Sequence, residues 1–248
     1  MLEINKIHLG DCLELMKLIP DKSIDMILCD LPYWTTACKW DTIIPFEPLR
    51  EQYKRIIKDN GAIVLTASQP FTSALVMSNT DMFKYEWIWE KHKWTNFMAV
   101  KREPLKIHES VLIFGGKNYK PQMTEGKPYK PRGSHNVVKS HSIVNANKHI
   151  WYSDTFDPSK RYPVSIQKFS NHNQKENSFH PTQKPVALFE YLIKTYTNEW
   201  DIVLDNCAWS WTTAIACINT NRNYIMIEQL QEYVDIANKR LSEIVEKK

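Results

Sequence analysis

Residues 24–33 read IDMILCDLPY, and this stretch decides the fold. Residues 24–29 form a nearly continuous apolar run that ends at Asp30. Such a run is typical of a strand buried on both faces of a parallel sheet. Open α/β sheets bind their ligands beyond the carboxyl ends of the strands, so Asp30 is predicted to lie where a ligand would bind.

Strand and helix patterns alternate on both sides of this stretch. Further strands are predicted at residues 4–9, 61–66, 85–89, 110–114, 202–204 and 224–227, and helices at residues 11–18, 46–58, 70–78, 186–195, 212–219 and 232–247. This alternation predicts right-handed βαβ units and a doubly wound, mostly parallel α/β sheet.

The pattern dissolves between residues 116 and 179, which are rich in Lys, Pro, Asn, Ser and His. We interpret this segment as a loop-rich insertion into one α/β domain. The chain therefore divides into residues 1–115, the insertion 116–179, and residues 180–248, which complete the domain that the first part begins.

Composition excludes several classes of protein. The chain has 248 residues, 43% of them hydrophobic, but no apolar run approaches the roughly 20 residues that span a bilayer. The first residues lack the layout of a signal peptide, so a cytoplasmic protein without a membrane partner is expected. Five cysteines with no metal-binding spacing predict reduced, mostly buried thiols and no metal site.

The charge is distributed unevenly along the chain. Residues 91–184 hold 17 Lys and Arg against 6 Asp and Glu, whereas the whole chain has a net charge of only +4. A basic block between acidic flanks is typical of a surface that binds a polyanion. A solvated insertion with incidental charge would give the same pattern.

Three predicted strands end in an acid, namely Asp30, Asp205 and Glu228. After the first of them, Pro32 biases Leu31 toward an extended conformation and so directs the Leu31 carbonyl. A carboxylate and a carbonyl can together accept both hydrogens of an exocyclic amine, and the ring of Tyr33 can stack on a flipped base. The four residues 30–33 are therefore candidates for holding a poorly nucleophilic amine while an electrophilic methyl group approaches it.

Here the chain resembles a known family, the β-group DNA adenine-N6 methyltransferases. The stretch DLPYWTTACKWD at residues 30–41 is similar to the catalytic motif of that group, in which D-P-P-Y is the usual core. GDC at residues 10–12, HPTQKP at 180–185, DNCAWSWTT at 205–213 and Glu228 match its cofactor elements in the same permuted order. The likeness covers about three-quarters of the chain and leaves out the insertion, which stands where that group has its target-recognition region.

The resemblance implies a Rossmann-like fold, S-adenosylmethionine as cofactor, and duplex DNA as partner. Dimers are common in the group, so a homodimer is a candidate assembly. The catalytic residues that it implies are Asp30, Leu31, Pro32 and Tyr33. The cofactor-binding residues that it implies are Asp11, Cys12, His180, Thr182, Lys184, Asp205, Asn206, Cys207, Ser210, Thr212, Thr213 and Glu228.

The chain departs from this group at glycines. Trp34, Trp209 and Trp211 stand where the group has Gly, Trp200 stands at a turn where Gly would be ordinary, and no glycine follows Gly133. A side chain at a position with positive φ costs roughly 1–2 kcal/mol. Either the indoles at 209 and 211 turn away from the cofactor or stack on it, or they fill its site. We expect cofactor binding to be impaired or absent.

Three functions therefore remain open. The first is methyl transfer from S-adenosylmethionine to N6 of a flipped adenine in duplex DNA. The second is a catalytically inactive DNA-binding homologue or engineered variant whose cofactor site is plugged. The third is methylation of RNA or protein amines by the same pocket, which the order of the motifs makes the least favoured of the three.

Overall fold

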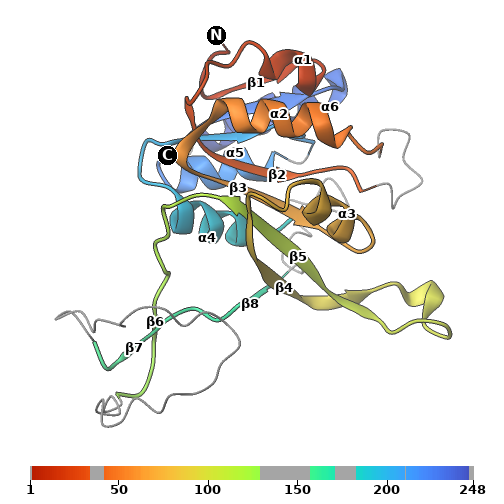
Figure 1. Ribbon diagram of the computed structural model, residues 1–248, viewed down its shortest axis with the longest axis vertical. Coiled ribbons are helices and arrows are strands. Elements are labelled where there is room, and N and C mark those ends of the chain that lie inside the picture. Colours follow the sequence, from red (N-terminus) through yellow and green to blue (C-terminus); the bar gives the residue numbers. More distant parts are fainter. Residues whose placement is uncertain (1, 34–41, 129–156, 171–182, 210, 246–248) are drawn as a thin grey trace. The chain divides into compact units, whose positions relative to one another are not determined.

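The computed structural model describes residues 2–33, 42–128, 157–170, 183–209 and 211–245 (Figure 1). The chain forms two compact units, Met1–Lys120 with Val164–Lys248, and Pro121–Pro163. Within the described residues, no helix combines the length and the apolar character that crossing a membrane requires.

The larger unit is built on an eight-stranded sheet in the order β1-β10-β9-β2-β3-β5-β4-β8. Strands β1, β10, β9, β2 and β3 are parallel to one another, β5 is antiparallel to both β3 and β4, and β8 is parallel to β4. The strands are β1 (Lys6–Leu9), β2 (Ile24–Asp30), β3 (Ile57–Ala67), β4 (Phe83–Thr95), β5 (Lys106–Gly115), β8 (Ile166–Phe169), β9 (Ile202–Asp205) and β10 (Asn223–Glu228). The predicted α/β fold with a mostly parallel sheet is confirmed.

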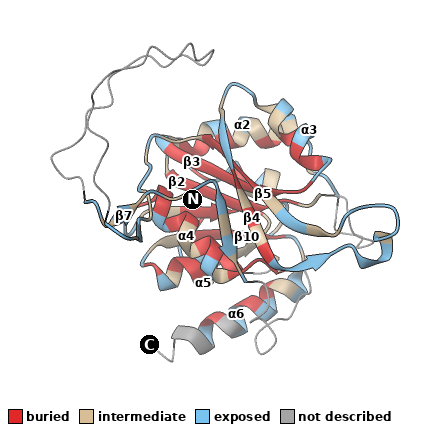
Figure 2. Cartoon of the chain, turned by 90° about the horizontal axis from the view of Figure 1, so that it is seen from below, coloured by how far each residue is buried: buried red, intermediate tan, exposed pale blue. Residues whose placement is uncertain are grey.

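Helices cover both faces of this sheet. They are α1 (Cys12–Met16), α2 (Phe46–Ile56), α3 (Phe71–Ser78), α4 (Val186–Tyr196), α5 (Thr212–Asn219) and α6 (Gln231–Val245). Residues from α1, α2 and α3 pack in one hydrophobic cluster, and residues from α4, α5 and α6 pack in a second one. Figure 2 shows α2 and α3 on one side of the buried strands and α4 and α5 on the other.

Strand β2 lies at the centre of the fold and is buried along its whole length. Its side chains alternate between the two clusters, with Ile27 in one and Leu28 in the other. Period-two alternation sends successive side chains to opposite faces, so a strand that has helices on both faces must be apolar throughout. This is why the run at residues 24–29 predicts the central strand.

Three strands are much longer than predicted: β3 and β5 begin four residues before their predicted starts, at Ile57 and Lys106, and β4 extends to Thr95 instead of ending at residue 89. Its last four residues, His92 to Thr95, are exposed and show no apolar run. The insertion 116–179 also contains a strand that its composition does not predict, because β8 joins the main sheet beside β4. In the smaller unit, β6 (Thr124–Glu125) pairs antiparallel with β7 (Lys160–Arg161).

Candidate active site

Three acids meet at one edge of the sheet. Asp30 ends β2, Asp205 ends β9 and Glu228 ends β10, and these strands lie side by side and parallel in the order β10-β9-β2. A cavity of about 960 Å³ opens at this edge and is lined by Asp30, Glu228 and residues from several connecting segments. Its size is at the upper end for small-molecule sites.

The tetrapeptide 30–33 forms part of the cavity wall. Both carboxylate oxygens of Asp30 have partners: Oδ1 lies 2.5 Å from Tyr33 Oη, and Oδ2 lies 2.8 Å from Lys184 Nζ. Thr66 also donates its hydroxyl to Asp30 Oδ1. Asp30 and Thr66 are paired across β2 and β3, so the sheet register itself brings this hydroxyl to the carboxylate.

Lys184 is buried between two acids, since its Nζ also lies 3.3 Å from Glu109 Oε2. Lys91 forms an ion pair with the same Glu109, so four alternating charges form a chain from β4 to β2. Burial alone would lower the pKa of Lys184, but the carboxylates of Asp30 and Glu109 raise it above its usual value. Burial would raise the pKa of Glu109, but Lys184 and Lys91 hold it below its usual value. Lys184 and Glu109 are therefore both charged at neutral pH.

Sequence reasoning missed Glu109, Lys91 and Thr66. Glu109 stands at the start of the apolar run at residues 110–114, and β5 is antiparallel to β3. The beginning of an antiparallel strand lies at the same edge as the carboxyl ends of its parallel neighbours. An acid directly before an apolar run is thus the signal that could have indicated Glu109, had the direction of β5 been known.

The ring of Tyr33 is packed within the protein. It stacks on Phe71 with the two ring centroids 5.2 Å apart. Lys184 Nζ lies 5.4 Å from the centroid of the Tyr33 ring. Burial, followed by the charge of Asp30, raises the pKa of Tyr33 well above its usual value, so the phenol stays protonated.

The other predicted site residues lie around the same edge, but several are engaged within the protein. Asp11 caps α1 by accepting hydrogen bonds from the backbone N–H groups of Leu13, at 2.8 Å, and of Glu14, at 3.2 Å. Glu228 accepts a hydrogen bond from the Leu230 N–H at 2.8 Å, and burial raises its pKa. Asp11 and Glu228 both line the cavity.

Asp205 lies beneath the loop that follows β9. Its carboxylate accepts hydrogen bonds from Thr213 Oγ1 at 2.5 Å and from the Cys207 N–H at 3.1 Å. Burial raises the pKa of Asp205 to about 6, although both hydrogen bonds favour its charged form. Thr212 is also buried and donates its hydroxyl to the Lys184 carbonyl at 3.2 Å. Asp205 and the two threonines thus hold the loop in position.

Cys12, Asn206 and Cys207 line the cavity, and Asn206 accepts a hydrogen bond from Tyr53 Oη at 2.6 Å. Of the four cysteines that the structure describes, two are buried and two half-buried, and all four are free thiols. Burial raises the pKa of Cys29 to about 12. His180, Thr182 and Ser210, which the sequence also places in the cofactor set, and Trp34 lie outside the described residues.

The tryptophans at glycine positions take different places. Trp211 has φ 42° and Trp200 has φ 68°, so both adopt the left-handed conformation that favours glycine. The Trp211 side chain is 3% exposed, and Trp200 is 70% exposed. Trp209 forms part of the cavity wall, and the cavity remains open beside it. In the described residues Trp209 therefore borders the cavity and leaves it open, and the expectation of impaired cofactor binding stays a prediction.

Comparison with known proteins agrees with this geometry. The DNA methylase family that comprises N6 and N4 enzymes matches residues 24–239. The chain belongs to this family of DNA methyltransferases. The Type II methyltransferase M1.MboII of Moraxella bovis is 28% identical over 98% of this chain and 99% of its own length. The DNA adenine methyltransferase YhdJ of Escherichia coli is 29% identical over 94% of this chain and 81% of its own length.

Solved structures of DNA methyltransferases share the fold. The crystal structure of the M1.HpyAVI–SAM complex has a TM-score of 0.63 and 25% identity, and the match covers 95% of this methyltransferase and 98% of that chain. The cytosine-N4-specific PvuII DNA methyltransferase has a TM-score of 0.67 at 16% identity, over 94% and 84% of the two chains. A cytosine-N4-specific enzyme thus shares the fold, so the fold alone does not identify the target base.

Proposed function

We propose that this methyltransferase transfers a methyl group from S-adenosylmethionine to N6 of an adenine flipped out of duplex DNA. The observation that carries the proposal is the position of Asp30, at the end of a buried strand and in the wall of a cavity that extends to Glu228. The same cavity is thus lined by two carboxylates, Asp30, which is suited to an amine, and Glu228, which is suited to hydroxyl groups. The adenine specificity is supported by the resemblance of residues 30–33 to the D-P-P-Y core of adenine-N6 enzymes and by the name of the relative YhdJ.

The residues around the cavity fit the cofactor. Glu228 and Asp11 bring acceptor oxygens to one end of the cavity, where they would hold the hydroxyl groups of a ribose. Trp209 also lines the cavity, and its indole would stack on a purine ring. Asp205 and Thr213 would act indirectly, because they fix the loop that carries Asn206 and Cys207. When bound, S-adenosylmethionine supplies an electrophilic methyl group on a sulfonium.

At the other end, Asp30 Oδ2 and the Leu31 carbonyl would accept the two hydrogens of the adenine amine. This arrangement would aim the nitrogen lone pair toward the methyl donor and reduce its delocalisation into the ring. The amine must then take the place at Oδ2 that the Lys184 ammonium holds, 2.8 Å away. Glu109 Oε2 lies 3.3 Å from Lys184 Nζ, so Lys184 can remain ion-paired with Glu109 when the amine displaces it from Asp30.

The test is methylation of mixed-sequence duplex DNA with methyl-labelled S-adenosylmethionine, followed by digestion to nucleosides and mass spectrometry. We expect N6-methyladenine from the wild type and none from Asp30→Ala. Glu14→Ala, an exposed acid on α1, is the matched control and should behave as the wild type. N4-methylcytosine as the product would overturn the adenine specificity. No methylated base from a folded wild type would overturn the activity.

A further inference from the structure

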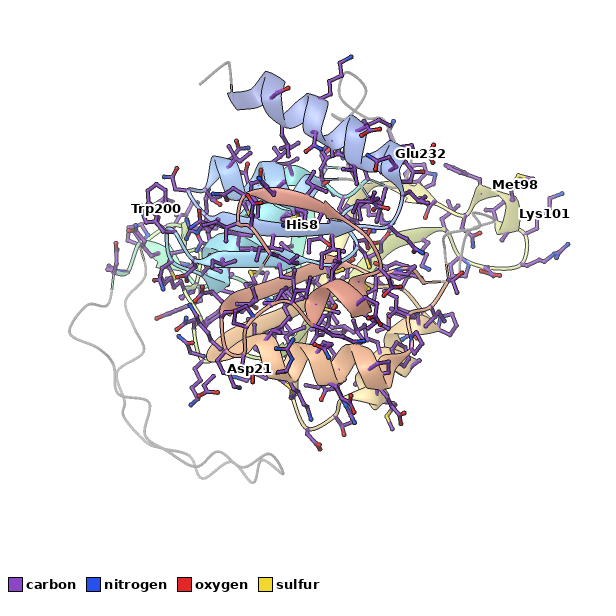
Figure 3. The ribbon with its side chains drawn as sticks, turned by 90° about the horizontal axis from the view of Figure 1, so that it is seen from above. His8, Asp21, Met98, Lys101, Trp200 and Glu232 are labelled. Atoms are coloured by element: carbon purple, nitrogen blue, oxygen red, sulfur yellow. The ribbon has the colours of Figure 1, made fainter. Side chains whose placement is uncertain are left out.

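The strands β4 and β5 extend beyond the rest of the sheet as an arm, residues 92–107. At its tip, the 3-10 helix η1 (Phe97–Ala99) follows Asn96, which adopts φ 75° and donates its side-chain amide to Glu103 at 3.0 Å. The backbone N–H groups of Arg102 and Glu103 bond the Ala99 carbonyl at 2.7 and 2.9 Å. The tip is thus a closed turn held by its own hydrogen bonds, and it projects from the body of the unit (Figure 3).

This arm exposes an unusual amount of apolar surface. Met98 is fully exposed, Phe97 is 61% exposed, and Val100 and Trp94 are about half exposed. The rings of Trp94 and Phe97 are in edge-to-face contact, with 6.5 Å between their centroids. Neighbouring exposed apolar side chains of this kind mark an interaction site more often than scattered ones do.

The same arm is basic. Between residues 92 and 107 there are four Lys and Arg and a single acid, Glu103, which already accepts the Asn96 amide. Lys101 and Arg102 are exposed directly beside the apolar tip, and Figure 3 shows Lys101 pointing outward near Met98. A second copy of this chain would bring the same positive charge against itself in a symmetric interface, whereas a polyanion would be attracted.

The arm also borders the catalytic cavity. Thr95 and Lys106, which pair with each other at the base of the arm, line the cavity together with Asp30. Any duplex whose base enters the cavity must therefore come close to the arm. The continuity of the two surfaces favours DNA over an unrelated partner.

We propose that the arm binds duplex DNA beside the flipped base, with Lys101 and Arg102 on phosphates and the apolar side chains of Phe97 and Met98 wedged against the unstacked base step. This inference rests on the proposed function. Unstacking and flipping a base is energetically unfavourable, and apolar wedges inserted at base steps are a known way to stabilise the opened duplex. Phosphate contacts position the protein on the duplex without reading its sequence.

The first experiment measures the salt dependence of binding to a fluorescein-labelled random-sequence duplex. Lys101→Ala/Arg102→Ala should lower the slope of log Kd against log salt by roughly two, since each phosphate contact contributes about 0.9. Lys17→Ala/Lys54→Ala is the matched control and should keep the wild-type slope, since Lys17 at the C-cap of α1 and Lys54 on α2 are both exposed. An unchanged slope for the arm variant would overturn the phosphate contacts whether or not the chain methylates DNA.

The second experiment compares methylation of duplex and single-stranded forms of the same oligonucleotide by Phe97→Ser/Met98→Ser. We expect the rate on the duplex to fall at least 10-fold and the rate on the single strand to stay within about 2-fold, because the single strand needs no wedge. Equal losses on both substrates, or none, would overturn the wedge while leaving the proposed function intact. Met77→Ser, an exposed methionine on α3, is the control.

Sedimentation of the wild type and of the serine variant completes the test. A wild-type dimer that becomes monomeric in Phe97→Ser/Met98→Ser, with unchanged rates on both DNA forms, would assign the arm to contacts between copies of this chain and overturn the proposal. The absence of methylation by the wild type would refute the proposed function, and the salt slopes would then decide the DNA contact alone.

Discussion

Lys184 Nζ lies 2.8 Å from Asp30 Oδ2, although 154 residues separate the two in the sequence. Both side chains are less than 10% exposed. The ion pair joins the segment before α4 to the end of β2, and it places a cation where the proposed substrate amine would be held. Lys184 thus occupies the amine position in the folded chain, and its removal should affect both stability and activity.

Lys184→Met should destabilise the protein by about 3 kcal/mol, because losing one partner of a buried ion pair leaves the other charge uncompensated. Urea denaturation would measure this, with Lys17→Ala as control, since the exposed pair of Lys17 with Glu14 is worth less than about 1 kcal/mol. Adding Asp30→Asn to Lys184→Met should recover part of the loss. Additive losses would contradict the pairing.

Tyr33→Phe should lower kcat/KM for DNA methylation by about 10-fold while the protein remains folded. The hydroxyl 2.5 Å from Asp30 Oδ1 orients the carboxylate, and one such hydrogen bond is worth roughly 1.5 kcal/mol. Steady-state kinetics with labelled cofactor would test this. Tyr85→Phe removes a hydroxyl that bonds Tyr196 at 3.0 Å outside the cavity and should leave kcat/KM unchanged. Equal activity of Tyr33→Phe and the wild type would show that Asp30 is oriented without Tyr33.

The sequence predicts those parts of the site that depend on one strand. The apolar runs before Asp30, Asp205 and Glu228 predict buried parallel strands, and parallel strands end at a common edge. The contacts of Lys184 with Asp30 and Glu109 could not be predicted. They depend on the direction of β5 and on the path of the segment before α4, which has no apolar periodicity. Neither property can be recognised from a local sequence pattern.

Asp205→Asn should stabilise the protein at pH 8 by about 2 kcal/mol. Burial raises the pKa of Asp205 from its usual 3.8 to about 6 in the folded chain, so the folded state binds its proton more tightly than the unfolded state does. The cost of the buried charge is fully present above pH 6 and disappears below pH 4. The advantage of the variant should therefore shrink as the pH falls from about 6 to 4.

Thr213→Val provides the matched control for this pH dependence. It removes the hydroxyl that donates to Asp205 at 2.5 Å, so the pKa of the acid should rise further and the variant should lose stability mainly above pH 6. Thermal unfolding from pH 4 to pH 8 would follow both variants. If the difference in stability between Asp205→Asn and the wild type did not change with pH, the charge of Asp205 would not destabilise the folded protein.

Two glycine substitutions should have opposite effects, although both relieve a positive φ. Trp200, at φ 68°, is 70% exposed, so Trp200→Gly removes the strain of the left-handed conformation and little packing, and we expect a gain of up to about 1 kcal/mol. Trp211, at φ 42°, is 3% exposed, and Trp211→Gly would leave a cavity that costs about 3 kcal/mol or more. Urea denaturation of both variants tests this. A stabilised Trp211→Gly would show that the buried indole contributes less to packing than its backbone strain costs, and cofactor affinity measured by calorimetry should then rise with stability.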